Sequence, residues 1–442
     1  MSVLLFIAGV LFVAVGIAVS IALHEVGHLV PAKLFGVRVT KYMIGFGPTI
    51  WSIRRGETEY GFKAIPAGGY VSMIGMYPPN SSDGTVRPSS TGMFQTLATE
   101  ARSLAHEEVG PNDGKRVFYA LPVWKKIIIM LGGPFMNLLI GTVLMAVLLM
   151  GFGTAQATTT LADVSACQVK YGDPVPTDLS TCTKTPAAAA GLKPGDTITR
   201  FDGKAVTGWN QLTDWIRAAA GRNVAITVQR GGQQVATTIT PVLTSRPVTD
   251  INGNARKDSS GQAMMADVGF IGVGATSVLA PQPASAVLPA VGDNLTKMVG
   301  VVVNLPQRVV AVGQAAFSSA PRDPNGPISV VGVGRAAGEV ASMQDVPLSA
   351  RVGTLVGLVA SVNLALFVFN LVPLLPLDGG HIAGALYEAV SRRVAKLFRR
   401  RDPGPFDIAK LLPVTYVVAA LLLAMSALLM YADIVKPINI FG

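Results

Sequence analysis

The pattern of hydrophobic and polar positions is dominated by four long stretches without a charged residue. They are Ser2–Leu23, a stretch from Ile127 to beyond Met150, Val352–Leu377 and Leu411–Ala432. A helix rises about 1.5 Å per residue, so each stretch can cross a hydrocarbon layer of roughly 30 Å. Buried helices of soluble proteins rarely run this far without a charge. The pattern predicts four transmembrane helices, because a further apolar stretch, 299–305, is too short to span.

The first stretch could instead be a cleaved signal peptide. No basic residue precedes it, and its apolar run is longer than the roughly 7–15 residues of a signal-peptide core. The histidines that follow at its end also carry chemistry that cleavage would remove. We therefore interpret it as a retained transmembrane helix.

The segment between the first two predicted helices has a strand pattern. Residues Thr58–Ile65 alternate polar and apolar side chains, a period of two that is typical of a β-strand. The surrounding residues, 36–77, are rich in Gly, Thr, Tyr and Phe. We expect a β-hairpin or small sheet close to the membrane.

The region between the second and third predicted helices has the composition of a soluble domain. Strand patterns at Thr197–Phe201 and Val224–Arg230 flank a helical pattern at 209–219, and Gly231–Gly232 predicts a hairpin turn before another strand. Over residues 185–245 this order resembles a bacterial PDZ domain. The resemblance implies a module that binds peptide termini or extended segments by strand addition.

The charged residues predict how the chain is oriented in the membrane. Only 14% of the residues are charged, about half the share of a soluble protein, and the net charge is +10. Lys and Arg gather between helices one and two and again at 392–401, whereas the N-terminus has none. By the positive-inside rule these two segments are cytoplasmic, and both termini and the PDZ-like region are extracytoplasmic. The sequence shows no basic face supported by a nucleic-acid-binding motif, so nucleic-acid binding is not expected.

Two cysteines, Cys167 and Cys182, fall in the region predicted to be extracytoplasmic. They could form a disulfide there, or remain two unpaired thiols in a loop. The sequence leaves both alternatives open.

The clearest chemical signal is the run His24-Glu25-Val26-Gly27-His28 at the end of the first predicted helix. Residues four apart share a helix face, so both imidazoles can reach one metal ion. Glu25 is placed to act as the general base of a metalloprotease. Ionisable side chains at membrane depth are costly and are functional by default, which argues against histidines that merely reach the interface.

A catalytic zinc site uses three protein ligands and leaves one position open. Asp378 is the first charge after the uncharged stretch that begins at Val352, and the charge distribution places it at the same membrane side as His24 and His28. A turn formed by Asp378 and Gly379 is the alternative reading of this residue. Because the histidine motif supplies only two ligands, we expect Asp378 to be the third.

These features together resemble the site-2 protease family, intramembrane zinc metalloproteases that perform regulated intramembrane proteolysis. The resemblance is to the bacterial branch that carries a PDZ domain. It covers essentially the whole chain and includes 65–71, which is similar to the membrane-associated hairpin of the family, and Gly133 to Asn137, which is similar to its Gly-x-x-x-Asn feature. One departure is the spacing of Pro373 and Pro376, three apart where many members have Pro-x-Pro.

The resemblance implies a role for each matching residue. His24, His28 and Asp378 would hold Zn²⁺, and Glu25 would be the general base that later passes the proton to the leaving amine. Further residues would bind or orient an extended substrate or support the ligands: Asn370, Asn137, Gly68 and Gly69 for substrate, and His381 as an outer hydrogen-bond partner of a ligand.

The predicted fold class is a multi-pass α-helical membrane protein with four transmembrane helices, a membrane-associated β-hairpin region and an extracytoplasmic α/β PDZ domain. The predicted segments are helix one at 1–32, a cytoplasmic-side segment at 33–125, helix two at 126–152, an extracytoplasmic region at 153–350, helix three at 351–380, a basic cytoplasmic loop at 381–410, helix four at 411–432 and an extracytoplasmic tail at 433–442.

The predicted function is hydrolysis of single-span membrane proteins already trimmed by another protease, in a bacterial cell membrane. Cleavage of an anti-sigma factor and clearance of signal-peptide remnants fit equally. A PDZ-containing scaffold or pseudoprotease is the alternative, but it would usually lack Glu25 or a ligand. A metal transporter is weaker, since its ligands would be distributed along a path rather than gathered at one depth.

Overall fold

The computed structural model describes residues 2–78, 113–114, 116–169, 182–248, 262–318, 322–323 and 326–438, without the side chains of 66–67. Residues 79–112 of the predicted 33–125 segment therefore lie outside the described residues. The chain divides into two compact units. One unit is formed by Met1–Phe152 together with Pro281–Gly442, and the other by Gly153–Ala280.

Five helical segments among the described residues are long and apolar enough to cross a membrane. Four of them match the predicted helices: Ser2–Leu34, Val123–Phe152, Leu348–Asn370 and Ile408–Val435. The fifth is Ala284–Val303, which extends well before the short stretch at 299–305. Asp293 and Lys297 interrupt the apolar run of this helix. A search for uncharged stretches therefore finds only the short part that follows Lys297. Four spans therefore remain a prediction, whereas a multi-pass membrane protein is supported.

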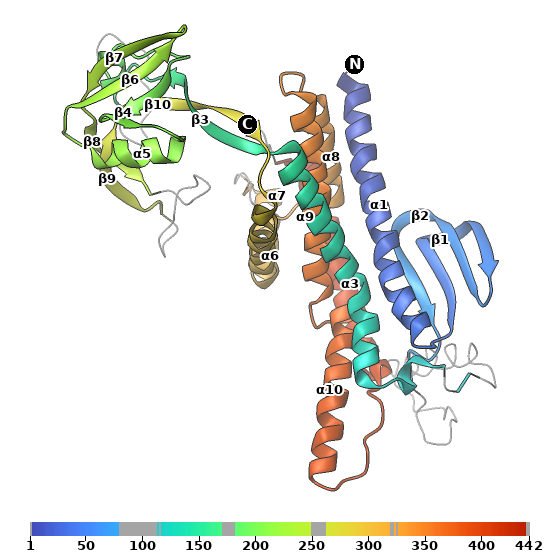
Figure 1. The fold of residues 1–442 in the computed structure, drawn as a ribbon. Coiled ribbons are helices and arrows are strands. Elements are labelled where there is room, and N and C mark those ends of the chain that lie inside the picture. Colours follow the sequence, from blue (N-terminus) through green and yellow to red (C-terminus); the bar gives the residue numbers. More distant parts are fainter. Residues whose placement is uncertain are drawn as a thin grey trace. The chain divides into compact units, whose positions relative to one another are not determined.

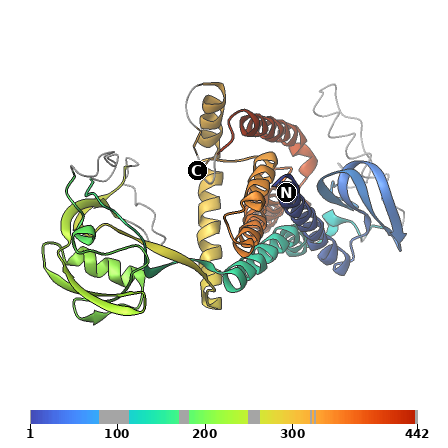
Figure 2. The ribbon, with the colours of Figure 1, turned by 90° about the horizontal axis from the view of Figure 1, so that it is seen from above.

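Helices α1 (Ser2–Leu34), α3 (Val123–Ala146) and α9 (Leu348–Asn370) pack side by side at the centre of the first unit, as Figures 1 and 2 show. The α1 and α3 backbones touch where two glycines meet. A Cβ added to Gly132 would lie 1.9 Å from the carbonyl oxygen of Gly27. Small residues permit this approach, and no larger side chain fits. The crossing point therefore lies within the histidine motif of α1.

Strands β1 (Val39–Arg55) and β2 (Thr58–Met73) form the predicted sheet beside the end of α1 (Figure 1). Residues 41–44 of β1 pair both with 59–62 and with 69–72 of β2, so the first part of β1 lies between two parts of β2. Within the described chain, the segment 69–72 has a strand partner only on its β1 side. The sheet therefore presents an open edge there.

The segment after α9 explains how Asp378 is presented. Helix α9 ends at Asn370, and α10 (Asp378–Leu397) begins at Asp378 itself. Pro373 and Pro376 lie in the irregular connection, where the missing N–H groups and the proline rings prevent a continuous helix. The predicted third helix, 351–380, is thus two helices, and much of the predicted loop at 381–410 is α10.

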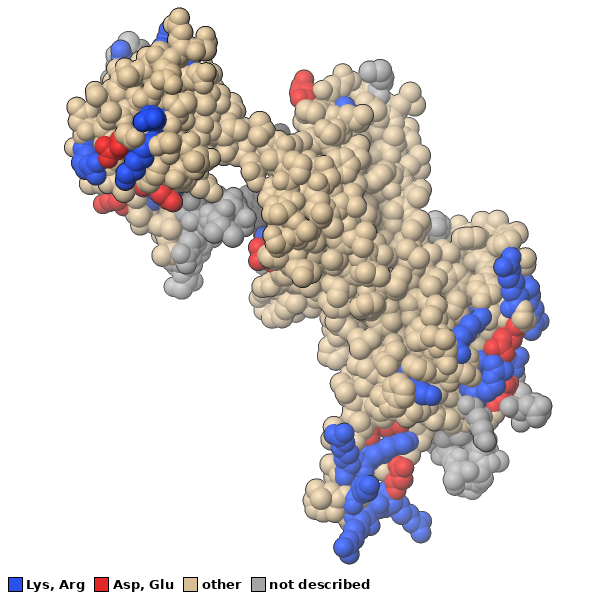
Figure 3. Space-filling view, in the orientation of Figure 1, with Lys and Arg blue, Asp and Glu red and all other residues tan. Residues whose placement is uncertain are grey.

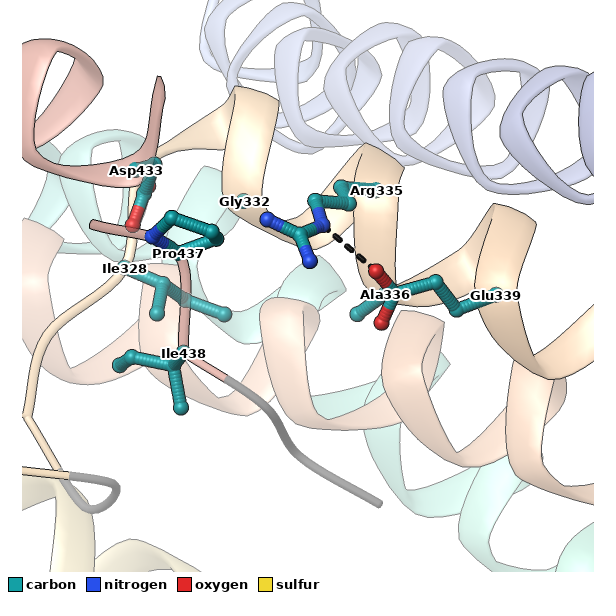
Figure 4. A pocket seen from close by; sticks show the side chains of 8 residues that line it. All are labelled: Ile328, Gly332, Arg335, Ala336, Glu339, Asp433, Pro437 and Ile438. Carbon is teal, nitrogen blue, oxygen red and sulfur yellow. Dashed lines mark hydrogen bonds and ion pairs between the residues drawn. The ribbon is translucent and has the colours of Figure 1, made fainter. Parts of the chain in front are cut away.

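Other helices complete the first unit. They are α6 (Val287–Val303), α7 (Leu305–Phe317), α8 (Val330–Ser342) and α11 (Leu412–Val435), with short turns at Val147–Phe152, Phe118–Ala120, Ala284–Ala286 and Ile408–Leu411. Helix α8 packs on α1, and a Cβ on Gly9 would lie 2.4 Å from the Ala337 carbonyl oxygen. A small cavity lies between α8 and the end of α11, bordered by Arg335, Glu339 and Asp433 (Figure 4).

The second unit is a β-sheet domain with one longer helix. Its sheet order is β10-β3-β4-β6-β7, with β5 paired to β4, and β8 and β9 form a separate pair. The core includes Ile198, Phe201, Leu212 and Ile226, all at most 1% exposed. The elements are β3 (Thr154–Val164), α4 (Pro186–Ala189), β4 (Thr197–Phe201), β5 (Lys204–Ala205), α5 (Trp209–Ala218), β6 (Val224–Arg230), β7 (Gln233–Ile239), β8 (Val242–Pro247), β9 (Met265–Phe270) and β10 (Val273–Ala280).

This unit is larger than the predicted 185–245 module, because β3 and β8–β10 belong to it. The predicted strands and helix within that module are present at nearly the predicted positions. The structure also joins Cys167 and Cys182 in a disulfide, with their Cα atoms 5.6 Å apart. Of the two alternatives left by the sequence, the pairing is the one found.

Asp196, in the turn before β4, is the best-connected buried charge of this unit. Its carboxylate accepts hydrogen bonds from Arg230 Nε and Nη2, both at 2.7 Å, and from the Lys193 N–H at 2.8 Å. The Arg230 hydrogen bonds outweigh the cost of burial and hold the pKa of Asp196 below its usual range.

A folded-state pKa below the unfolded value gives stability that is complete above the unfolded pKa of about 4 and is lost as pH falls through the folded pKa. We expect Asp196→Asn to weaken hydrogen-exchange protection of β4 and β6 at pH 7 and to have a progressively smaller effect as the pH falls below about 4. The control is Asp202→Asn, which removes an exposed pair with Arg222 and should have little effect at either pH. Equal effects of the two substitutions would contradict this assignment.

Candidate metal centre

His24 and His28 lie one turn apart on α1 and face the same side. Their ring centroids are 4.9 Å apart, and their Nε2 atoms are separated by 3.2 Å. His28 is 5% exposed. The two nitrogens therefore converge on one point next to the α1–α3 crossing.

Asp378 reaches the same point from the first turn of α10. Its Oδ2 atom lies 3.3 Å from His24 Nε2, and its Oδ1 atom lies 3.4 Å from His28 Nε2. One ligand atom from each of the three residues falls within 4.8 Å of the others. Two histidines of α1 and an aspartate far along the chain, at the start of α10, thus form one cluster that could hold a metal ion.

The other ring nitrogen of each histidine contacts α3. His28 Nδ1 lies 2.7 Å from the Ile129 carbonyl oxygen, so Nδ1–H donates and Nε2 keeps its lone pair for the cluster. His24 Nδ1 lies 3.0 Å from the Asn137 amide, whose Oδ1 is buried without a hydrogen-bond partner among the described residues. Turning the amide by 180° lets Oδ1 accept from His24 Nδ1–H, and this leaves His24 Nε2 free as a ligand too.

At Gly133, α3 lies so close to the two imidazoles that no side chain would fit there. A Cβ added to Gly133 would lie 2.2 Å from His28 Nε2 and 2.6 Å from His24 Nε2. Asp378 Oδ2 is buried and has no hydrogen-bond partner among the described residues. Two imidazole nitrogens and a carboxylate with an unsatisfied oxygen are a donor set that suits zinc.

Glu25 follows His24 on α1 and lies against the β1–β2 sheet. A Cβ added to Gly69 would be 2.9 Å from Glu25 Cγ, so the β2 backbone passes directly beside this side chain. The neighbouring Gly68 has a φ of +120°, which favours glycine, and faces the ring of Phe46. Gly69 thus borders Glu25 and Gly68 lies against Phe46, and the substrate-binding role expected for both stays a prediction.

Tyr42, on β1, is a neighbour of Glu25 that the sequence analysis does not identify. Its hydroxyl donates to the Ala22 carbonyl at 2.8 Å. Burial, with smaller contributions from Glu25 and Tyr60, raises the pKa of Tyr42 to about 12, so the hydroxyl stays a donor. The Ile129 carbonyl is also missed, since a backbone carbonyl carries no sequence signal, whereas Gly133 is part of the Gly-x-x-x-Asn feature without a role of its own.

Three other predicted residues have distinct placements. Asn137 contacts His24, whereas its expected role is to bind or orient the substrate. Asn370 is the last residue of α9 and is partly exposed. His381 lines a small cavity with Lys126 and Glu388, and its buried Nδ1 has no hydrogen-bond partner within the described chain.

Comparison with known proteins points to a family of zinc metalloproteases. The sequence model of peptidase family M50 matches residues 12–400. The zinc metalloprotease Rip1 of Mycobacterium tuberculosis is 33% identical over 99% of this chain and 100% of its own length. Rip1 of Mycolicibacterium smegmatis is 32% identical over the same shares, and the metalloprotease MmpA of Caulobacter vibrioides is 26% identical over 88% of each chain.

Gly133 offers a test of the metal centre that leaves every donor atom in place. We expect Gly133→Ala to lower zinc affinity at least tenfold, because the added methyl group overlaps both ligand nitrogens. Alanine favours the helix more than glycine, so helix propensity would not explain a loss. Zinc content after dialysis against a graded chelator measures the effect.

The matched control is Gly151→Ala at the end of the same helical segment, where a Cβ meets nothing within 4 Å. It should keep the zinc affinity of the unchanged protein. Retention of zinc by Gly133→Ala would show that the metal does not lie between these imidazoles.

Proposed function

The chain belongs to peptidase family M50 and is a multi-pass zinc metalloprotease, and from this premise we propose that it hydrolyses peptide bonds of single-span membrane proteins within or close to the bilayer. The observation that carries the proposal is the convergence of His24, His28 and Asp378 beside Glu25, with both histidines on α1, a helix apolar enough to span a membrane. Charged and polar side chains gathered at that depth are costly unless they serve a function.

In this proposal His24, His28 and Asp378 hold the zinc ion. When bound, zinc lowers the pKa of water and polarises the scissile carbonyl. The Ile129 carbonyl fixes the His28 tautomer, and Asn137 does the same for His24. Their role is to keep both Nε2 lone pairs directed into the site.

Glu25 is the general base of the proposed reaction. Its carboxylate takes a proton from the attacking water and later delivers that proton to the leaving amine. Tyr42, on β1, is a hydrogen-bond donor to the Ala22 carbonyl close to this base.

The open edge of β2 is the proposed binding site for an extended substrate. A helical peptide bond is shielded by its own hydrogen bonds, and an unwound segment in lipid needs new partners for its backbone groups. The unpaired side of 69–72 offers such partners by strand addition. Gly69 lets that backbone pass close to Glu25, and Asn370 would help to orient the same segment.

The sheet also presents an apolar surface that fits the lipid. Five large side chains on β1 and β2 are 47–72% exposed: Phe46, Ile50, Trp51, Phe62 and Ile65. Water would disfavour this patch, whereas hydrocarbon or a transmembrane substrate would cover it. This supports the proposal that the hairpin lies at the membrane.

Charge supports a site on the cytoplasmic side. Lys and Arg side chains gather at the end of α10 and on the β1–β2 sheet, and the helical surface beside them is largely uncharged (Figure 3). By the positive-inside rule this end of the unit is cytoplasmic. We propose that both termini and the Gly153–Ala280 unit are extracytoplasmic.

For the second unit we propose a PDZ-like role in binding peptide ends. A groove runs between α5 and 268–273, lined by Trp209, Thr213, Ile216 and Arg246 among others. The Arg246 guanidinium stacks 4.0 Å from the centre of the Phe270 ring, and its Nη2 donates to the Val169 carbonyl. Its buried Nε has no hydrogen-bond partner among the described residues, which suits a terminal carboxylate.

A peptide with a free carboxyl end should bind this groove better than the same peptide with an amidated end. We expect Arg246→Gln to weaken binding of the free-acid peptide about 10-fold or more, because it removes a charge-assisted hydrogen bond. Fluorescence anisotropy with the full-length protein measures the affinities. Arg222→Gln, which alters an exposed arginine of the same unit, serves as the control. Equal affinity for both peptide forms would contradict the carboxylate assignment.

Cleavage of a single-span substrate trimmed to a short extracytoplasmic end tests the protease itself. In liposomes we expect product from the unchanged protein, loss of product with a zinc chelator and a decrease of at least 1000-fold in Glu25→Gln, because the base also returns the proton. Glu339→Gln, which removes a pair with Arg335, is the control and should stay active. Substrate binding without cleavage by the unchanged protein would favour the scaffold alternative.

A further inference from the structure

A buried ion pair joins α3 to α10 on the face that carries the metal centre. Lys126 Nζ lies 2.8 Å from Glu388 Oε2, and the two side chains are only 5% and 2% exposed. The partners are 262 positions apart in the sequence. Burying a charge costs several kcal/mol, so a buried ion pair is weak evidence of net stabilisation. We therefore look for a geometric role of this pair.

Glu388 connects two helices and a third, non-helical segment. Its Oε2 atom also accepts a hydrogen bond from the Phe406 N–H at 3.1 Å, and its Oε1 atom lies 3.0 Å from Arg392. The carboxylate therefore ties α3, α10 and the connection to α11 together. One side chain fixes three segments at this end of the helical unit.

Lys126 belongs to the same stripe of α3 as the residues around the histidines. The spacing 126, 129, 133 and 137 repeats every three to four residues and defines one helix face. Ile129 receives the His28 hydrogen bond, Gly133 faces both Nε2 atoms and Asn137 contacts His24. The face of α3 that contacts the two histidines of α1 thus also carries Lys126, which pairs with Glu388 on α10.

The third ligand depends on α10 for its position. Asp378 is the first residue of this helix, and the connection from α9 is not helical. Helix α10 therefore cannot inherit its direction from α9 and needs a contact along its side. Glu388 provides that contact ten residues beyond Asp378, about 15 Å along the helix axis.

We propose that Lys126 and Glu388 are positioning residues, whose ion pair sets α10 against α3 and so holds the Asp378 carboxylate within reach of His24 and His28. This inference rests on the proposed role of Asp378 as the third zinc ligand. Neither residue touches the substrate or the reacting atoms.

The test measures metal binding by the full-length protein in detergent. We expect Lys126→Met and Glu388→Gln each to weaken Zn²⁺ affinity about 10–100-fold in competition with a chromogenic chelator. In the Co²⁺-loaded protein, the visible absorption bands should shift toward those of Asp378→Asn, because the same carboxylate is displaced. Cleavage should lose kcat with little change in KM.

A second buried pair supplies the matched control. Arg322 and Asp433 are 4% and 2% exposed and join the end of α11 to the segment before α8. We expect Arg322→Met and Asp433→Asn to lower thermal stability as much as the other variants, yet to keep zinc affinity and the Co²⁺ spectrum. Similar metal loss in both sets would overturn the proposal and leave the Lys126–Glu388 pair a purely structural one.

Single substitutions leave one charge buried and could prevent folding. The double variant Lys126→Met/Glu388→Leu removes both charges and should fold, and it should still bind zinc less tightly than the unchanged protein. Unchanged affinity in the double variant would overturn the proposal. By contrast, full zinc affinity and an unaltered Co²⁺ spectrum in Asp378→Asn would show that the ligand assignment itself is wrong.

Discussion

The backbone contact between Gly27 and Gly132 is the constraint on which the rest of the structure depends. It brings α1 and α3 together at the histidine motif, closer than any larger residue would permit. At this separation the Ile129 carbonyl reaches His28, and Gly133 lies against both imidazoles. A wider crossing would separate the ligands of α1 from the groups that orient them.

Helix α3 supports the metal site without contributing a ligand to it. None of the proposed ligands lies on it, yet one of its faces contacts both histidines and grips the helix that carries Asp378. In a membrane interior the hydrophobic effect contributes little to helix packing. Close backbone contacts and polar pairs must therefore hold the helices together. The cost of burying Lys126 and Glu388 is consistent with a contact kept for geometry rather than for stability.

The same site combines a fixed centre with an adaptable edge. The metal cluster is held by helices, whereas the proposed substrate position is a strand edge that offers backbone groups and little side-chain discrimination. Such an arrangement suits substrates that differ in sequence but share an unwound transmembrane segment. Selection among them would then fall to the second unit, where Arg246 lies in a groove formed by α5 and 268–273.

The sequence by itself determined four of the five apolar helical segments, the strand pattern of 58–65, the helix face shared by His24 and His28, and the family. These follow from local periodicity and short motifs, which need no knowledge of distant residues. It predicted Asp378 as a partner only through charge counting and resemblance. The tertiary structure decided what depends on contacts between distant segments: Asn137 against His24, the break that makes α10 a separate helix, the Cys167–Cys182 pairing and the Lys126–Glu388 pair. A lysine near the start of an apolar helix is typical of a membrane boundary, and only its burial against a carboxylate 262 positions away distinguishes it from an ordinary interfacial charge.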